Sequence, residues 1–428
     1  MPPLEVHPLP LALAACAFFA LLLVAWSDVR NLLRPSVAVA AMQLGFVVPG
    51  AVLADVPVDP GTRLAVAAVP LAMLSLACAT PRLGRDVRSL VSRCRQASAT
   101  PFESWAALLL SAGAASLVVV VFVILPWTRI GLYMLIVAPD ESLEARAASL
   151  RELDVPKLKA LITTYGKLLV PIGLGLVACL PLPGIRRMAV LPLAAGPAAL
   201  LAISGARLQL VLGAMTLAVA FAVRRWSTAM LGLLVMLAAA AAVVIGAATA
   251  ARIGEERGIG DVWERVFLRA TVLPFVAGSH HVEFVERFGT WSPEAYGFPF
   301  KTSLGFTHVE PAQAVGDWIN PGAGSLVSPP AAMDLIASFG LPLGMSAMLA
   351  YGLLLDLVAR ALAGVPPATA LACHTSLLLV SLALVNTTAG STATGVVMIL
   401  LGALLVRWQR ARRREAAPRA GSPTGIAV

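Results

Sequence analysis

Residues 104–127 read SWAALLLSAGAASLVVVVFVILPW, an apolar run without a charged side chain. As an α-helix it is long enough to cross the roughly 30 Å of hydrocarbon in a bilayer. Similar runs of about 17 to 25 residues recur along the chain. Lipid offers backbone groups no hydrogen-bond partner except the one inside the helix. The sequence therefore predicts an all-α integral membrane protein.

The composition excludes a soluble protein and argues against nucleic-acid binding. Hydrophobic residues make up 59% of the 428 residues and charged residues 13%, with a mean hydropathy of +0.85. The formal charge is +9, but the arginines form short clusters between apolar runs instead of a basic domain. The five cysteines form no CxxC pair and have no histidine at ligand spacing. We expect no disulfide, metal or cofactor.

We expect one polytopic membrane domain over residues 1–428 with about eleven transmembrane helices. The first apolar run lacks a basic leader and a cleavage site, so we interpret it as a retained span. The predicted spans are 9–26, 36–54, 64–80, 104–127, 168–184, 188–205, 208–223, 227–251, 332–358, 367–389 and 391–406.

The basic residues predict the orientation of these spans. With an outer N-terminus, most arginine clusters fall on one side, which the positive-inside rule makes cytoplasmic. These clusters are Arg30 and Arg34, Arg82 to Arg95, Arg186 and Arg187, Arg224 and Arg225, Arg360, and a basic tail over 407–428. We therefore expect a bacterial cytoplasmic (inner) membrane protein with a periplasmic N-terminus and a cytoplasmic C-terminus.

The largest extramembrane feature is the outer segment 252–331, far longer than an ordinary connection. Helical spacing of Trp263, Phe267 and their apolar neighbours predicts an amphipathic helix at the interface. A second short helix is expected from His281 to Phe288, followed by Gly- and Pro-rich loop. We interpret 252–331 as a large, partly helical periplasmic loop.

Outer arginines are the candidates for binding an anionic substrate, since a guanidinium fork matches a phosphate. Each arginine alone also fits contact with lipid head groups. The candidates for binding a diphosphate are Arg207, Arg265, Arg269, Arg146 and Arg151.

Three outer residues are candidates for a general base: Glu283, His308 and Asp334. The pattern His280-His281-Val-Glu283 lacks the i, i+4 pairing that aims two imidazoles at one metal ion. Asp334 enters a predicted span, where a carboxylate is expected to face protein or water. Further along that span, Asp356 and Arg360 are spaced for an i, i+4 ion pair.

Residues 322–344, GAGSLVSPPAAMDLIASFGLPLG, continue into Tyr351-Gly352. This stretch resembles the end of the large outer loop and the following span in Wzy-type O-antigen polymerases. The turn Ile203-Ser-Gly-Ala-Arg207-Leu is similar to the family's outer G-x-R turn, and 141–169 to its arginine-containing outer loop. His308 is reminiscent of the related O-antigen ligases instead.

The resemblance implies a GT-C-like bundle that transfers sugar without a metal ion. It implies an undecaprenyl-diphosphate-linked oligosaccharide as substrate, with membrane lipid and a chain-length regulator protein as candidate partners. Arginines would stabilise the leaving diphosphate. An O-antigen ligase, which uses a lipid A core as acceptor, remains an alternative. A lipid-linked oligosaccharide flippase or transporter is a second, although the spans carry their charge mainly at their ends.

We predict that removing the charge at Arg207 and at the arginines of 252–331 abolishes glycan assembly. The reason is that these guanidinium groups would no longer stabilise the negative charge that develops on the departing diphosphate. The length distribution of surface polysaccharide measures this effect in strains that carry correctly inserted variants. Unchanged long chains would contradict the role assigned to these arginines.

Overall fold

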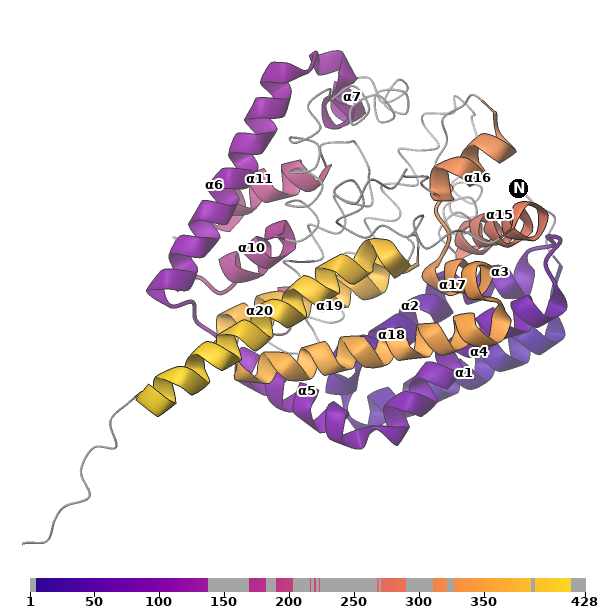
Figure 1. Cartoon of the computed structure of the whole chain (residues 1–428), viewed down its shortest axis with the longest axis horizontal. Coiled ribbons are helices and arrows are strands. Elements are labelled where there is room, and N and C mark those ends of the chain that lie inside the picture. Colours follow the sequence, from indigo (N-terminus) through magenta and orange to yellow (C-terminus); the bar gives the residue numbers. More distant parts are fainter. Residues whose placement is uncertain are drawn as a thin grey trace, which may run out of the picture.

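The computed structural model describes the residues that carry the fold. They are 5–137, 169–181, 190–202, 216, 219–220, 223, 268, 271–289, 311–321, 327–385 and 389–416. Within these ranges the chain is all-helical and contains no strand (Figure 1). This confirms the predicted secondary-structure class for the described part of the chain.

Five helical segments of the described chain are long and apolar enough to cross a membrane. They are α1 (Pro8–Ser27), α2 and α3 together (Pro35–Phe46 and Val48–Leu53), α4 (Pro60–Ala79), α6 (Pro101–Ile124), and α18 with η7 (Leu341–Ala361 and Leu362–Gly364). Each coincides with a predicted span to within several residues, except the last.

The remaining described helices fill the space between these five and extend the two ends of the bundle. They are η1 (Val29–Leu33), α5 (Pro81–Cys94), η2 (Trp127–Arg129), α7 (Gly131–Val137), α10 (Val170–Val177), α11 (Val190–Ala202), α15 (Leu273–Phe288), α16 (Pro311–Ile319), α17 (Ala331–Phe339), α19 (Pro367–Ala383) and α20 (Ala389–Ala416).

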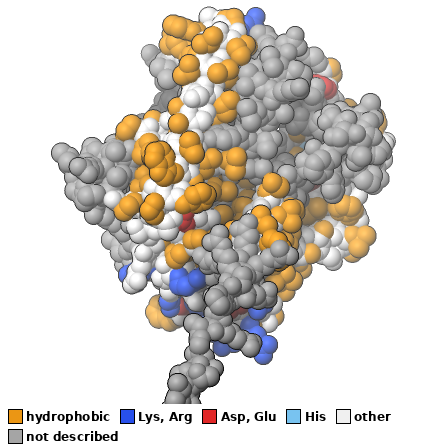
Figure 2. All heavy atoms as spheres, turned by 60° about the vertical axis from the view of Figure 1, so that its left-hand side comes forward, with side chains coloured by type: hydrophobic (Ala, Val, Ile, Leu, Met, Phe, Trp, Pro, Cys, Tyr) orange, Lys and Arg blue, Asp and Glu red, His pale blue; other side chains and the backbone are white. Residues whose placement is uncertain are grey.

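The outward faces of α1 and α6 are apolar, as expected of helices that meet lipid. Leu23 on α1 is 70% exposed and Val123 on α6 is 79% exposed. Figure 2 shows groups of apolar side chains on the described part of the face that comes forward, while the arginines visible there gather mainly at its lower end. A soluble monomer rarely exposes so many large apolar side chains along two helices, which supports a membrane protein.

Small residues let the inner helices approach one another closely. A Cβ added at Gly175 of α10 would lie 2.6 Å from the Cα of Ala372 on α19. A Cβ at Gly196 of α11 would lie 2.8 Å from the Cβ of Ala115 on α6. Close packing of this kind is typical of membrane helices, which gain no hydrophobic driving force from lipid.

The starts of α6 and α19 are stabilised by side chains that form hydrogen bonds with the otherwise unpaired backbone N–H groups of the first turn. Thr100 and Glu103 form a capping box at the start of α6, with the Thr100 N–H donating to Glu103 Oε2 at 2.9 Å. The second carboxylate oxygen of Glu103 accepts from the N–H of Thr369 at 3.0 Å and from its hydroxyl at 2.6 Å. One carboxylate therefore closes the first turns of both α6 and α19.

The span predicted over 332–358 is wrong as a single helix. The helix is interrupted at Gly340, whose φ of +76° is a backbone conformation that glycine adopts more readily than other residues. A new helix, α18, starts at Leu341, with Pro342 in its first turn. A Cβ at Gly344 would lie 2.6 Å from the Cα of Ile336, so α17 and α18 pack tightly beside the break. The short α17 therefore lies at the end of the bundle instead of continuing the span.

Arginines collect at one end of the described bundle, which we call the basic end. It consists of η1, α5, η7 and the C-terminal part of α20. The Arg30 guanidinium donates to the hydroxyl of Ser92 on α5 at 3.3 Å, and Arg360 pairs with Asp86 at 3.0 Å. A Cβ at Gly364 would meet the side chain of Arg407. The helices α3, α15, α16 and α17 lie at the opposite end (Figure 1).

Asp356 does not pair with Arg360, so the expected i, i+4 pair is wrong. Asp356 Oδ2 instead accepts from Arg34 Nε at 2.6 Å, and both side chains are almost fully buried. The N–H and hydroxyl of Ser36 also donate to the Asp356 carboxylate, at 3.0 and 2.7 Å. Burial explains why Asp356 pairs with Arg34 and not with Arg360. The Arg34 guanidinium is desolvated and needs an opposite charge more than the exposed Arg360 does.

We predict that Asp356→Asn lowers the free energy of unfolding by about 3 to 5 kcal/mol, because it leaves the Arg34 charge buried without a counter-charge. Asp86→Asn is the matched control. Its ion pair with Arg360 is largely exposed, so we expect a change of about 0 to 1 kcal/mol. Unfolding in mixed micelles measures both, and equal losses in the two variants would refute this ranking.

Candidate functional site

Two of the residues expected to carry chemistry fall within the described chain, namely Glu283 and Asp334. Their surroundings can be read directly. The other candidates lie outside the described residues: His308, Arg146, Arg151, Arg207, Arg265 and Arg269. The predicted amphipathic helix around Trp263 also lies outside them. The candidate site is therefore built here around α15, which carries Glu283.

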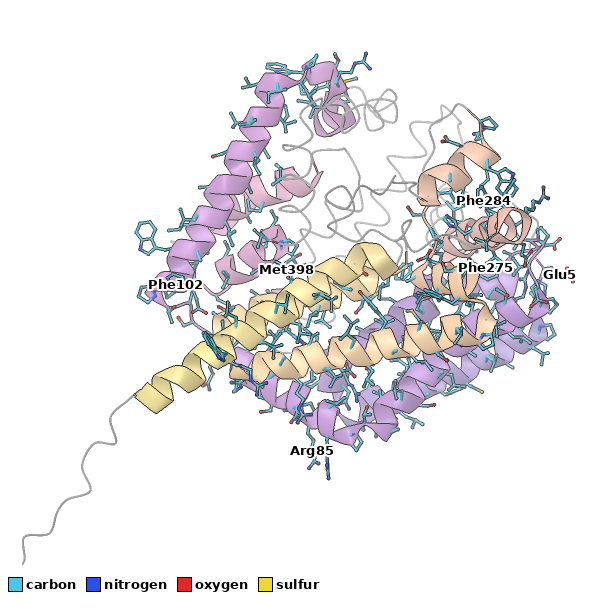
Figure 3. The ribbon with its side chains drawn as sticks, viewed as in Figure 1. Glu5, Arg85, Phe102, Phe275, Phe284 and Met398 are labelled. Atoms are coloured by element: carbon cyan, nitrogen blue, oxygen red, sulfur yellow. The ribbon has the colours of Figure 1, made fainter. Side chains whose placement is uncertain are left out.

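The helix α15 begins at Leu273, earlier than the helix expected from His281 to Phe288. Its buried face packs on α3 and α17. A Cβ at Gly50 of α3 would lie 3.1 Å from the Phe275 ring, and one at Gly278 would clash with Met333 of α17. Figure 3 shows Phe275 and Phe284 on this helix at the end of the bundle. Close packing on two neighbours fixes the direction in which each side chain of α15 points.

His281 lies on the buried face of α15 and is fully inaccessible to solvent. Its Nε2 lies 2.6 Å from the backbone oxygen of Val327. A carbonyl oxygen only accepts, so Nε2 carries the proton and the ring is held in one tautomer. Burial lowers the pKa of His281 from its ordinary 6.5 to about 4. This histidine is neutral near pH 7 and joins α15 to the segment that leads into α17.

His280, Glu283 and Arg287 line the accessible face of the same helix. The Nδ1 of His280 lies 3.8 Å from one carboxylate oxygen of Glu283, and Arg287 Nη2 lies 2.8 Å from the other. The i, i+3 and i, i+4 spacings bring the three side chains together on one helix face. Glu283 is thus placed between an imidazole and a guanidinium.

Aromatic rings extend this face toward α16. The Trp318 ring centroid lies 5.7 Å from that of Phe284 and 6.5 Å from that of His280, both in edge-to-face arrangement. The Arg287 guanidinium lies 5.4 Å above the Trp318 ring. Phe288 completes the group and is 62% exposed. We call His280, Glu283, Arg287, Trp318 and the two phenylalanines the histidine–aromatic cluster.

Asp334 occupies the first turn of α17, where a negative charge suits the helix dipole. It is 1% exposed, so its carboxylate faces protein and not solvent. The backbone oxygen of Asp334 accepts from the Ser338 hydroxyl at 2.6 Å. Asp334 and Glu283 therefore lie on neighbouring helices, but only Glu283 faces the accessible surface.

The cluster combines three chemical abilities. The Glu283 carboxylate lies 3.8 Å from the His280 Nδ1, beyond hydrogen-bond length, and its negative charge favours the imidazolium that forms when His280 takes a proton. The Arg287 guanidinium can balance a negative charge, and the exposed ring of Phe288 can stack on an apolar ring face of a ligand, with the half-buried Phe284 and Trp318 packed behind it. Within the described residues, no three His, Cys, Asp or Glu side chains converge on one point that could hold a metal ion.

Comparison with known proteins adds nothing to this geometry. No protein-family model, no curated protein and no solved structure matches the chain.

Sequence reasoning identified Glu283 but missed the aromatic side of the cluster. Trp318 follows Glu283 by more than thirty residues of sequence and belongs to a separate helix, α16. No local pattern joins the two, because their proximity depends on how α15 and α16 pack. The i, i+3 and i, i+4 spacing of His280, Glu283 and Arg287 was the available signal for the rest, although the predicted helix began at His281 and left His280 out.

We predict that the protein loses up to about 3 kcal/mol of stability as the pH falls from 6.5 toward 4. The folded-state pKa of His281 is depressed to about 4, so the unfolded chain takes up the proton first. Above pH 6.5 this contribution is complete and constant. His281→Gln removes the titration while keeping an N–H donor for Val327.

Unfolding at a series of pH values measures how steeply the free energy of unfolding changes with pH in the parent protein and in His281→Gln. The matched control is His280→Gln, which changes the adjacent, more accessible histidine and should keep the parent slope. If His281→Gln kept the full pH dependence of the parent protein, a group other than His281 would be responsible for that dependence.

Proposed function

We propose that this chain is a membrane glycosyltransferase that polymerises undecaprenyl-diphosphate-linked oligosaccharide repeat units. The proposed protein is a single GT-C-like domain of about eleven spans in the bacterial inner membrane. Its basic end faces the cytoplasm, as the positive-inside rule favours, and its N-terminus is periplasmic. The histidine–aromatic cluster then lies on the periplasmic side.

One observation carries the proposal. An imidazole, a carboxylate and a guanidinium lie beside an aromatic group whose outermost ring, Phe288, is exposed, at the end of the bundle opposite the basic end. Such a surface can hold a sugar by ring stacking while its anionic lipid carrier stays between the helices. The resemblance of 322–344 and of the Arg207 turn to Wzy-type polymerases points to the same substrate.

In the proposed reaction, an acceptor sugar hydroxyl attacks the anomeric carbon of the lipid-linked oligosaccharide. The new bond joins the acceptor oxygen to that carbon, and the bond from the carbon to the diphosphate oxygen breaks. The proton of the hydroxyl passes to His280, whose protonated form the nearby Glu283 carboxylate favours. Arg287 contributes positive charge toward the leaving diphosphate together with Arg207, Arg265, Arg269, Arg146 and Arg151. Glu283, His308 and Asp334 remain candidate bases.

The ligase alternative shares this chemistry and differs only in the acceptor, a lipid A core. The flippase or transporter alternative has one observation in its favour. His374 is fully buried within the apolar helix α19, and the Arg34–Asp356 pair is buried between α2 and α18. Ionisable groups inside a membrane domain often mark a transport path. Arg34 precedes α2 and Asp356 lies near the end of α18, so this pair agrees with the expectation that the spans carry their charge mainly at their ends, whereas His374 lies further inside α19.

We predict that Glu283→Gln slows polymerisation by roughly 100-fold, because the His280 imidazole loses the negative charge that favours its protonated form. Glu286→Gln is the matched control, one turn away on the same helix and exposed, and should stay within about twofold. The purified protein is supplied with an undecaprenyl-diphosphate-linked repeat unit, and the product lengths are resolved by electrophoresis.

The product pattern separates the candidate functions. A ladder of lipid-linked chains supports the polymerase, and transfer of one repeat only to an added lipid A core identifies a ligase. Movement of the intact substrate across a vesicle membrane without any ladder identifies a flippase. A ladder that Glu283→Gln leaves unchanged would remove the cluster from the reaction.

A further inference from the structure

A cavity of about 180 Å³ opens at the basic end, far from the histidine–aromatic cluster. It lies between α1, η1, α4 and α5. Its polar lining includes Ser27, Asn31, Arg34 and Arg88. The apolar part of the lining includes Val24, Val37, Ala77 and Pro81. A polar wall beside an apolar wall fits a molecule with a charged head and a hydrocarbon body.

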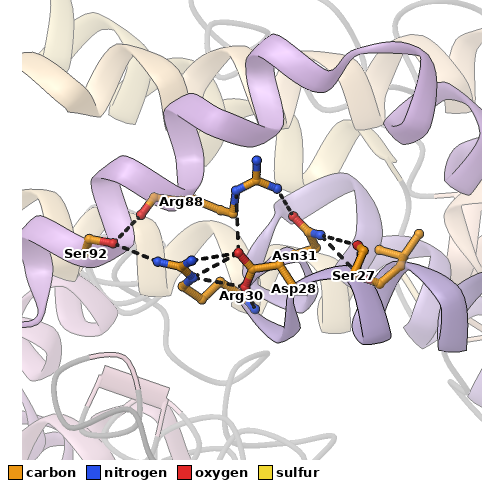
Figure 4. A network of polar contacts seen from close by, with 7 residues as sticks. Ser27, Asp28, Arg30, Asn31, Arg88 and Ser92 are labelled. Carbon is orange, nitrogen blue, oxygen red and sulfur yellow. Dashed lines mark hydrogen bonds and ion pairs between the residues drawn. The ribbon is translucent and has the colours of Figure 1, made fainter.

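Arg88 is held in position by a chain of hydrogen bonds, drawn in Figure 4. Its Nη1 donates to Asn31 Oδ1 at 2.9 Å. The amide nitrogen of Asn31 in turn donates to the Ser27 hydroxyl at 3.1 Å and to the Val24 carbonyl at 3.2 Å. This chain orients the guanidinium before any ligand arrives, which reduces the entropy lost on binding.

One edge of the Arg88 guanidinium keeps unused donor capacity. Its Nε lies 3.7 Å from Asp28 Oδ2, and its Nη2 has no contact with the residues drawn in Figure 4. The Arg88 side chain is 30% exposed. A guanidinium with one edge fixed and another open suits a phosphate group, because its planar fork of N–H groups can donate two parallel hydrogen bonds to the phosphate oxygens.

The local charge is positive despite two carboxylates. Arg30 donates three hydrogen bonds to the Asp28 side chain, and these contacts hold the pKa of Asp28 below its ordinary value. The charge of Asp356 is balanced by Arg34. Among Arg30, Arg34, Arg88, Asp28 and Asp356 the arginines are in excess, so an anion entering the cavity meets a net attraction.

The position of the cavity also fits a lipid head group. α5 is amphipathic, with Leu83, Val87 and Leu90 buried and Arg85 pointing outward (Figure 3). A helix of this kind at the end of apolar spans lies in the membrane interface, where phosphates of anionic lipids gather. The cavity is therefore at the depth where a head group would reach Arg88 while its acyl chains lie along α1.

We propose that this cavity binds the phosphate group of an anionic membrane lipid, with Arg88 as the main contact. The lipid is distinct from the oligosaccharide substrate, because the cavity lies at the opposite end of the bundle from the histidine–aromatic cluster. The proposal needs only that the chain spans a membrane, so it stands apart from the proposed function.

The test uses Cys78, an exposed cysteine in the cavity wall. The full chain in neutral detergent is alkylated with a maleimide after addition of phosphatidylglycerol, phosphatidylcholine or inorganic phosphate, and the modification is quantified by peptide mass. Phosphatidylglycerol should slow alkylation of Cys78 by roughly tenfold compared with phosphatidylcholine. Cys16, exposed on α1 outside the cavity, is the internal control and should react equally in each case.

Two variants locate the contact. Arg88→Gln should abolish the protection by phosphatidylglycerol, whereas Arg85→Gln, the same charge change three residues away on α5, should keep it. Gly84→Leu fills the cavity beside the Arg34 guanidinium without changing the charge, and should abolish the preference between lipids even if Arg88→Gln fails to fold. Native mass spectrometry counts the retained lipid in the same samples.

The lipid probes and inorganic phosphate separate the two sources of a phosphate group. Protection by phosphatidylglycerol alone supports a lipid site. Protection by inorganic phosphate at the same concentration would show that the cavity binds a soluble anion instead of a lipid. Equal protection by phosphatidylglycerol and phosphatidylcholine, or equal behaviour of Arg88→Gln and Arg85→Gln, would overturn the proposal.

Discussion

The buried pair of Arg34 and Asp356 holds together parts of the chain that are 322 positions apart. Arg34 also donates to the Ala77 carbonyl and the Thr80 hydroxyl at the end of α4. One guanidinium thus joins the start of α2, the end of α4 and the inner part of α18. Such a pair adds little net stability over apolar packing, but it penalises every arrangement that separates the partners. Its main effect is to select one arrangement of the helices.

The rest of the polar chemistry is divided between the two ends of that bundle. At the basic end, arginines pair with aspartates and surround a cavity open to the interface. At the other end, one helix presents a buried neutral histidine on one face and an accessible histidine, carboxylate and guanidinium on the other. This separation follows from the apolar spans, since lipid confines most polar side chains to the ends.

The sequence predicted what depends on local pattern. Apolar runs located α1, α4 and α6, and Glu283 on α15 was singled out as a candidate base from its place in the outer segment. The failures depend on distant contacts. Asp356 was assigned to Arg360 because the spacing was right, yet its partner comes from the other half of the chain. Similarly, a continuous apolar run concealed the break at Gly340, and no local signal placed Trp318 beside Phe284.

The shared carboxylate of Glu103 links membrane insertion to the order of synthesis. When α6 leaves the ribosome, Glu103 can cap only its own helix, because Thr369 lies 266 residues further along. At typical rates of translation that interval is on the order of tens of seconds. During this time one oxygen of a carboxylate at the membrane boundary must be satisfied by water or by the insertion machinery. Arrival of α19 displaces that temporary partner, so assembly of this part of the bundle finishes only after most of the chain has been made.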